Sequence, residues 1–173
     1  ICEAPGSGLL RVAVKKVAGG LVSTWVNEQL REGDTVDAMA PAGNFFADSN
    51  KAARRFLMVA AGSGITPIIS IVTTLLESHP DTLVTLIYGN RASPTIMFRE
   101  ALEDLKNRFL GRLNLVHVLT REQQDVDLFN GRLDRQKCEE LFRTWVDVSV
   151  MDAAYLCGPV AMMEAAKDVL LDC

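Results

Sequence analysis

The chain has 173 residues, of which 49% are hydrophobic and 23% are charged, so it is long enough for one or two small domains with a buried core. Its net charge of −4 gives no electrostatic reason to bind nucleic acid, and no apolar run approaches the roughly 18 residues of a membrane-spanning helix. The cysteines, Cys2, Cys138, Cys157 and Cys173, lack the spacing of a metal or iron–sulfur site, which predicts no metal centre in this chain and favours a cytoplasmic location.

The first 50 residues carry the pattern of an antiparallel β structure. Residues 9–17 alternate between apolar and polar side chains, which predicts a half-buried strand, and residues 35–39 predict a second one. Between them, Ser23 or Thr24 is expected to open a short helix over residues 25–30. Two strands without a βαβ rhythm favour part of an antiparallel β-barrel domain at 1–50. Because about 50 residues are too few to close a barrel, we expect further strands before Ile1 and a longer natural protein.

From Phe56 onward the pattern changes to strands that alternate with helices. Apolar runs predict strands at 56–61, 83–88, 113–119 and 153–157. Helical periodicity predicts helices at 67–78 and 98–109, a third after an Asp134 cap, and a last one from about Val160. This alternation predicts an α/β domain with a doubly wound parallel sheet at 51–173, separated from the first domain near residues 49–53.

The turn after the first of these strands is the strongest local signal. Gly62-Ser63-Gly64 follows the strand, and Thr66 and Pro67 are expected to be the N-cap and first residue of the next helix. A helix N-terminus beside glycines can bind a phosphate group, although a plain strand-to-helix turn fits the same residues. The turn matches neither G-x-G-x-x-G nor the G-x-S-x-G elbow that a hydrolase would need around Ser63.

Similar residues follow each of the four predicted parallel strands, at 62–66, 89–91, 120–122 and 157–159. Ligands of doubly wound sheets bind at the carboxyl ends of the strands, so the convergence of small, polar and cationic residues there favours a phosphate-bearing ligand. The second strand ends without the acidic residue that binds a free ribose hydroxyl. Arg91 and Arg121 are present instead, and an arginine fork suits a 2′-phosphate.

These motifs resemble the ferredoxin–NADP⁺ reductase superfamily over nearly the whole chain. The matching stretches of the nucleotide domain are Gly62-Ser63-Gly64-Ile65-Thr66-Pro67, Tyr88-Gly89-Asn90-Arg91, Thr120-Arg121-Glu122 and Cys157-Gly158-Pro159-Val160-Ala161-Met162. The stretch from Val14 to Trp25 resembles the flavin-pyrophosphate segment of the same family. Within the superfamily, residues 120–126 and 130–133 are most similar to the branch of reductase components of multicomponent oxygenases, phenylacetyl-CoA epoxidase included.

The resemblance implies a role for each matching residue. The flavin pyrophosphate would contact Lys15, Gly20, Ser23 and Thr24, which favours FAD. The nicotinamide and pyrophosphate of NADP, or of NAD, would lie along Gly62, Ser63, Gly64, Thr66, Cys157, Gly158, Pro159 and Met162. The adenosine end of the same cofactor would lie near Asn90, Arg91, Thr120 and Arg121. Cys157 and Thr66 would stand closest to the chemistry, as catalytic residues.

The implied activity is an oxidoreductase that passes a hydride from NADPH to bound FAD. Electrons would then reach a 2Fe–2S ferredoxin-like domain and an oxygenase component, as in phenylacetate degradation. The Arg-x-Tyr-Ser flavin motif, the terminal strand and the ferredoxin-like domain of this branch are not in the sequence, so we expect them elsewhere in the full-length protein. The alternatives are a non-catalytic nucleotide- or flavin-binding electron-transfer module and, less favoured, a small hydrolase built on Ser63.

Overall fold

The structure is a computed structural model, and it describes residues 1–47 and 54–173. Four parallel strands form one sheet in the order β3-β2-β1-β4. They are β1 (Arg55–Ala61), β2 (Leu83–Asn90), β3 (Leu113–Leu119) and β4 (Ala153–Cys157). Because β1 lies between β2 and β4, the strand order reverses at the β1–β4 boundary, as in a doubly wound sheet. The prediction of this fold class is confirmed.

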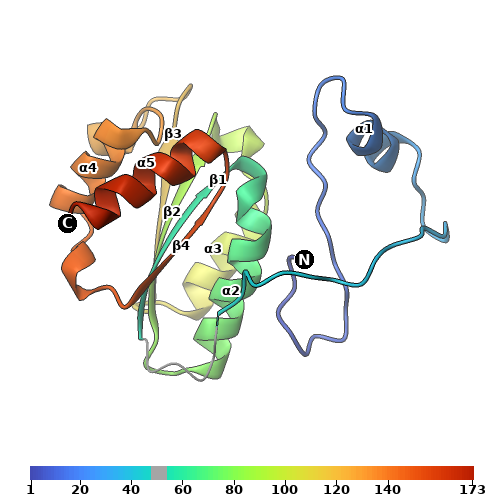
Figure 1. The fold of residues 1–173 in the computed structure, drawn as a ribbon, viewed down its shortest axis with the longest axis horizontal. Helices are drawn as coiled ribbons and strands as arrows, with labels where there is room; N and C mark the ends of the chain where they lie inside the picture. Colours follow the sequence, from blue (N-terminus) through green and yellow to red (C-terminus); the bar gives the residue numbers. More distant parts are fainter. Residues whose placement is uncertain (48–53) are drawn as a thin grey trace.

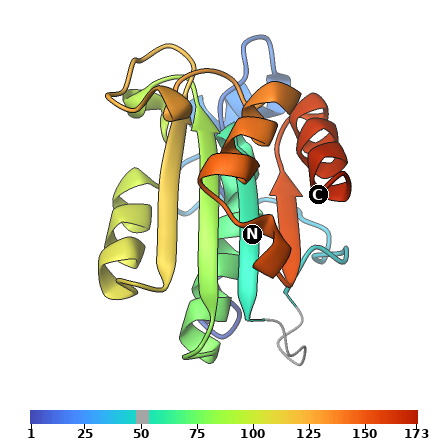
Figure 2. The ribbon, with the colours of Figure 1, turned by 90° about the vertical axis from the view of Figure 1, so that its left-hand side faces the viewer.

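Helices cover both faces of the sheet (Figure 2). Helices α2 (Ile65–Ser78) and α3 (Arg99–Arg108) pack on one face, and α4 (Arg135–Thr144) and α5 (Val160–Leu171) pack on the other. Strand β1 contributes to both cores, since Met58 faces the first cluster and Leu57 the second, each fully buried. A strand buried on both faces reads as a continuous apolar run, which explains why 56–61 has no alternation.

The helix boundaries confirm most of the sequence predictions, but α1 (Leu21–Glu28) and α2 both start earlier than expected. The Asp134 side chain accepts a hydrogen bond from the Lys137 backbone N–H at 3.0 Å and so caps α4 as expected. Thr66 does not cap α2. A single 3₁₀ turn over Gly62–Gly64 starts the helix at Ile65, with Gly64 as its N-cap. The Thr66 hydroxyl instead donates to the Ser63 carbonyl oxygen at 3.1 Å.

The N-terminal region, residues 1–47, lies to one side of the sheet (Figure 1). It contains one helix, α1 (Leu21–Glu28), and residues 9–17 and 35–39 form no strand. The prediction of two strands there is therefore wrong for this structure, and no barrel is seen in residues 1–47. An extended segment becomes a strand only by pairing its backbone with a neighbour, and within residues 1–47 and 54–173 neither segment forms a strand ladder. The predicted boundary at 49–53 lies outside the described residues.

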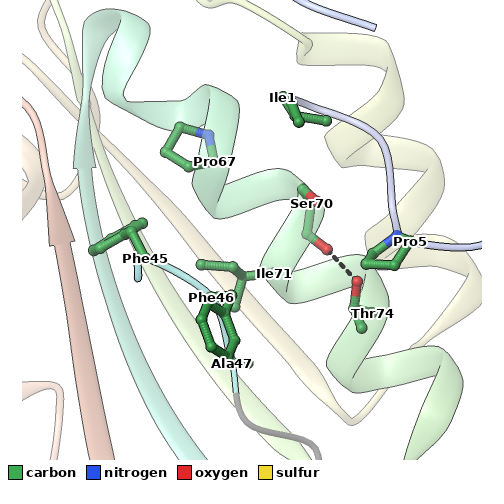
Figure 3. A pocket seen from close by; sticks show the side chains of 9 residues that line it. All are labelled: Ile1, Pro5, Phe45, Phe46, Ala47, Pro67, Ser70, Ile71 and Thr74. Atoms are coloured by element: carbon green, nitrogen blue, oxygen red, sulfur yellow. Dashed lines mark hydrogen bonds between the residues drawn. The ribbon is translucent and has the colours of Figure 1, made fainter. Parts of the chain in front are cut away.

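Residues 1–5 and 45–47 nevertheless contact the sheet domain, where they run past α2. The Ser70 hydroxyl donates to the Glu3 carbonyl oxygen at 2.6 Å. A shallow pocket lies along this contact (Figure 3). Its lining is Ile1, Pro5, Phe45, Phe46, Ala47, Pro67, Ser70, Ile71 and Thr74. None of the candidate site residues is part of this pocket.

No helix within residues 1–47 and 54–173 is both long and apolar enough to cross a membrane.

Candidate functional site

The residues that follow the four strands lie at one edge of the sheet, because all four strands run parallel. Gly62 follows β1, Arg91 follows β2, Thr120 follows β3 and Gly158 follows β4. Backbone hydrogen bonds continue beyond β2 and β3, with the Arg121 N–H donating to the Arg91 carbonyl oxygen at 2.8 Å. The structure thus brings together the four sequence segments that were expected to meet. The crevice expected for a doubly wound sheet falls between β1 and β4.

The glycine turn is held in a left-handed conformation at its first residue. Gly62 has a φ of +55°, which an L side chain rarely adopts. Its carbonyl oxygen accepts a hydrogen bond from the Tyr88 hydroxyl at 2.8 Å. The Lys15 ammonium lies 3.8 Å from the position that a Cβ on Gly62 would take. A cation from the N-terminal region therefore lies beside the turn and the N-terminus of α2, where an anion is favoured.

Gly64 is required by contact with the neighbouring strand end. A Cβ placed there would be 2.1 Å from the Cys157 carbonyl oxygen and 2.8 Å from the Gly158 nitrogen. The sequence suggested that the glycines admit a pyrophosphate, but at Gly64 the closest neighbour is protein backbone. The two turns therefore lie in direct contact here, and Gly64 sets their spacing.

The β4 side of the crevice is built from Cys157, Gly158 and Met162. Gly158 packs against Ala61 and the end of the buried Met162 side chain, both within 3.2 Å of a Cβ built on it. Cys157 is half-buried and forms no disulfide. Burial raises the pKa of its thiol, so the sulfur stays protonated and neutral. Pro159 is the exposed N-cap of α5.

At the β2 and β3 ends, one buried amide stands beside exposed cations. Asn90 is only 7% exposed, and neither polar atom of its side chain makes a hydrogen bond within the described residues. The Asn90 side chain lies close enough to the Tyr88 hydroxyl to lower the pKa of that hydroxyl. An unpaired buried amide is costly, so it is the group here that a polar ligand would best satisfy. Arg91 and Arg121 are exposed and form no ion pair within 1–47 and 54–173.

The carboxylate of Glu122, to which the sequence analysis assigned no role, joins these two loops. Glu122 accepts hydrogen bonds from the Ser93 N–H at 2.7 Å and from the Ser93 hydroxyl at 2.6 Å. These bonds lower the pKa of the Glu122 carboxyl. The loop that carries Arg91 is thereby tied to the loop that carries Arg121, and the Thr120 N–H adds a bond to the Asn90 carbonyl oxygen at 3.1 Å.

Of the residues expected at a flavin pyrophosphate, Gly20, Ser23 and Thr24 lie together at the start of α1. A Cβ on Gly20 would be 2.5 Å from the Ser23 hydroxyl, which accepts a bond from the Val17 N–H at 3.2 Å. Ser23 and Thr24 are the third and fourth residues of α1, not its cap, which is Gly20. The helix N-terminus and its glycine suit an anion, while Lys15 is directed to Gly62.

The side chains and backbone groups at the carboxyl ends of the four strands suit the binding of an anion. Within residues 1–47 and 54–173, no group of histidine, cysteine or acidic side chains could hold a metal ion. The edge instead supplies backbone N–H groups, one buried amide and three cations. A ligand with phosphate groups and a polar ring at one end fits this set. The fold and the edge together define a nucleotide-binding domain of the doubly wound class.

The chain belongs to the oxidoreductase NAD-binding domain family, whose model matches residues 58–168. This is the nucleotide domain of the ferredoxin–NADP⁺ reductase superfamily, and the resemblance noted from the sequence is confirmed.

Curated relatives are similar over almost all of this chain. It is 41% identical to one component of the 1,2-phenylacetyl-CoA epoxidase of Escherichia coli (strain K12), covering 98% of this chain and 48% of that protein. It is 34% identical to the ferredoxin reductase component of the 3-ketosteroid-9-alpha-monooxygenase of Mycobacterium tuberculosis, covering 98% and 44%. The chain therefore spans about half the length of these relatives.

Solved structures share the fold. The CS-b5R domains of human Ncb5or, in their NAD⁺ form, give a TM-score of 0.77 at 27% identity, covering 92% of this chain and 44% of that one. The flavohem-like FAD/NAD binding domain of the nitric oxide dioxygenase of Vibrio cholerae gives 0.73 at 26% identity, covering 88% and 59%.

Proposed function

We propose that this chain is the nucleotide-binding part of an NAD(P)H-dependent reductase of the ferredoxin reductase type. The observation that carries the proposal is the meeting of the glycine turn, the Asn90 amide, Arg91 and Arg121, and the Cys157–Pro159 turn at one edge of the sheet. The family membership and the names of the relatives support it.

Each part of the edge has a proposed task in binding the dinucleotide. The α2 N-terminus, with Gly62, Ser63, Gly64 and Thr66, holds the pyrophosphate, and Lys15 neutralises part of its charge. Arg91, Thr120 and Arg121 hold the adenosine end, and Asn90 supplies a buried polar partner. Cys157, Gly158, Pro159 and Met162 form the wall against which the nicotinamide ring lies. A neutral Cys157 thiol there excludes water without adding charge.

The flavin is proposed to be FAD, with its pyrophosphate at Gly20, Ser23 and Thr24. When both cofactors are bound, the nicotinamide would supply a hydride donor, and the FAD would supply the exchange between hydride and single-electron transfer. We further propose that the full-length protein delivers these electrons through a 2Fe–2S ferredoxin-like domain to an oxygenase component of the phenylacetate-degradation type, in the cytoplasm. The names of the curated relatives are the support for this partner assignment.

NADP(H) is proposed as the preferred nucleotide because Arg91 and Arg121, which have no ion-pair partner among the described residues, lie on adjoining loops. A charge-assisted hydrogen bond contributes about 1.5–3 kcal/mol, roughly 10- to 150-fold in affinity. Since Arg121 is exposed, Arg121→Ala should weaken NADP⁺ binding at the low end of this range, by about tenfold, and leave NAD⁺ binding nearly unchanged.

The test is calorimetric titration of both nucleotides into the wild type, Arg121→Ala and a control, Arg143→Ala. Arg143 is an exposed arginine in the last turn of α4 and is not part of the edge. Equal losses for the two nucleotides would assign Arg121 to a feature that both share. A wild type that binds NAD⁺ more tightly would contradict the NADP assignment, and one that binds neither would contradict the proposed function.

A further inference from the structure

The glycine turn is fixed from two sides by different kinds of contact. On the β4 side, Gly64 packs directly against the Cys157 carbonyl oxygen. On the β2 side, the turn is held by one side chain, Tyr88, whose hydroxyl donates to the Gly62 carbonyl oxygen at 2.8 Å. The Ile65 N–H also donates to that oxygen, from within the turn. The orientation of the Gly62–Ser63 peptide is therefore set by two donors, the Ile65 N–H from within the turn and the Tyr88 hydroxyl from the neighbouring strand.

Tyr88 is placed for this contact by the sheet register. It pairs with Ala60 in β1, one residue before the end of that strand. Its side chain is 0% exposed, and its ring lies 5.7 Å from the His117 ring in β3. The ring is thus fixed among core residues, and the hydroxyl at its tip reaches across the end of β1. A rigid, buried donor can hold a left-handed glycine at a φ of +55° more firmly than solvent can.

The donor is available at every working pH. Burial raises the pKa of the Tyr88 hydroxyl to about 12, against smaller opposing effects from the Asn90 side chain and the Met97 backbone. The hydroxyl therefore stays protonated, and its contact with the turn does not titrate under assay conditions.

We propose that Tyr88 is a positioning residue for the dinucleotide pyrophosphate: its hydroxyl fixes the Gly62 carbonyl inward, so that the Ser63 N–H, on the opposite side of the same peptide plane, faces the ligand. The first N–H groups of a helix have no intrahelical acceptor, and they bind an anion only if their peptide planes are aligned with it. The inference rests on the proposed nucleotide site and extends it to a residue that does not touch the ligand.

The test compares Tyr88→Phe with Tyr155→Phe, the other tyrosine of the chain. Tyr155 also donates to a backbone carbonyl, that of Phe46 at 3.3 Å, and it lies on β4 outside the glycine turn. Three ligands are titrated by calorimetry: NADP⁺, NAD⁺ and adenosine 2′-monophosphate. The third has no pyrophosphate and so reports on the arginine end of the site alone.

Tyr88→Phe should weaken both dinucleotides by about three- to tenfold, the usual effect of one neutral hydrogen bond, and leave adenosine 2′-monophosphate unchanged. Tyr155→Phe should change none of the three. Because Tyr88→Phe removes a buried hydroxyl and can lower stability, Gly62→Ala is the second variant. The added Cβ would meet only the Lys15 ammonium, at 3.8 Å, so the variant strains the backbone of the same turn without a steric clash. It should therefore give the same selective loss of dinucleotide affinity.

If the wild type binds the dinucleotides and either variant binds them with unchanged affinity, this inference is overturned and the proposed function stands. An equal loss for all three ligands would also overturn it, because the effect would then not be confined to the turn. A wild type that binds neither dinucleotide would overturn the proposed function itself, and this inference with it.

Discussion

The N-terminal region and the sheet domain both contain apolar patterns that predict strands, but only those of the sheet domain form strands in the structure. In residues 1–47, Cys2 is the only buried residue, and Leu9, Leu10, Val12 and Leu21 are exposed. In residues 54–173, two clusters cover the two faces of the sheet, and the central strands β1 and β2 are largely buried between them. The difference lies in how each region obtains partners. A βαβ unit supplies the next strand and a covering helix within about 30 residues, whereas the segments at 9–17 and 35–39 pair with no strand among residues 1–47 and 54–173.

The candidate site draws on both regions unequally. Its scaffold is the carboxyl edge of the sheet, where Gly64 and Cys157 are in direct contact. The N-terminal region adds Lys15 beside Gly62 and the turn before α1. We therefore expect stability to reside in the sheet domain, and the following changes, in order of decreasing effect, test that expectation.

Truncation of one leucine in each region should give the largest contrast. Leu57 is 0% exposed in β1, and Leu10 is 70% exposed. Leu57→Ala should lower the free energy of unfolding by about 2–5 kcal/mol, because it removes buried methyl groups and leaves a cavity. Leu10→Ala should change it by less than about 0.5 kcal/mol. Urea denaturation measures both, and similar losses for the two variants would show that the N-terminal region is packed as tightly as the sheet.

A single added methyl group at Gly64 should be the next largest effect. Gly64→Ala places a carbon against the Cys157 carbonyl oxygen, so the β1 and β4 turns must separate at a cost of about 1–3 kcal/mol. Gly8→Ala is the comparison in the N-terminal region, where nothing lies within 4 Å of the new Cβ and the φ of +73° is the only strain. Thermal unfolding of the two variants should differ clearly. If Gly64→Ala is as stable as the wild type, the strand ends do not depend on this contact.

The smallest effect is a dependence of sheet-domain stability on pH. Burial in β3, with Arg99 next in importance, lowers the pKa of His117, whose Nδ1 has no partner among the described residues. Below the unfolded-state pKa of about 6.5, the unfolded chain binds a proton that the folded chain resists, so stability should fall as the pH drops through that value.

Denaturation at pH 7.5 and 5.5 measures this slope, and His117→Gln should reduce it. An unchanged slope in His117→Gln would assign the dependence to other groups.

Much of the sheet domain could be predicted because its signals are local. The apolar runs of β3 and β4 have the predicted bounds, and Asp134 caps α4 through a bond only three residues away. The N-terminal strands could not be predicted reliably, since alternation shows that a segment suits a sheet but not that a partner strand is present. The start of α2 was misplaced because Thr66 is a good cap by type, while the 3₁₀ turn before it was not visible in the sequence.

Within the site, positions were easier to predict than contacts. The strand-end residues follow from the parallel topology, so their meeting was expected. The hydrogen bond from Tyr88 to Gly62 and the bonds from Ser93 to Glu122 join residues 26 and 29 positions apart. Such pairs depend on register and loop path, and a single sequence gives no signal for them. The one available hint was that a tyrosine in a buried strand needs a partner for its hydroxyl.

If the carboxyl edge of the sheet binds a nicotinamide dinucleotide, the backbone amides of that edge must respond to the ligand. NADP⁺ titration followed by amide chemical shifts measures this response residue by residue. We expect the shifts to concentrate in four segments, at residues 62–66, 90–93, 120–122 and 157–158. Amides near Ser70 and Thr74, at the shallow pocket on α2, should stay unchanged. Shifts centred on that pocket, or no shifts at saturating NADP⁺, would contradict the assignment of the site.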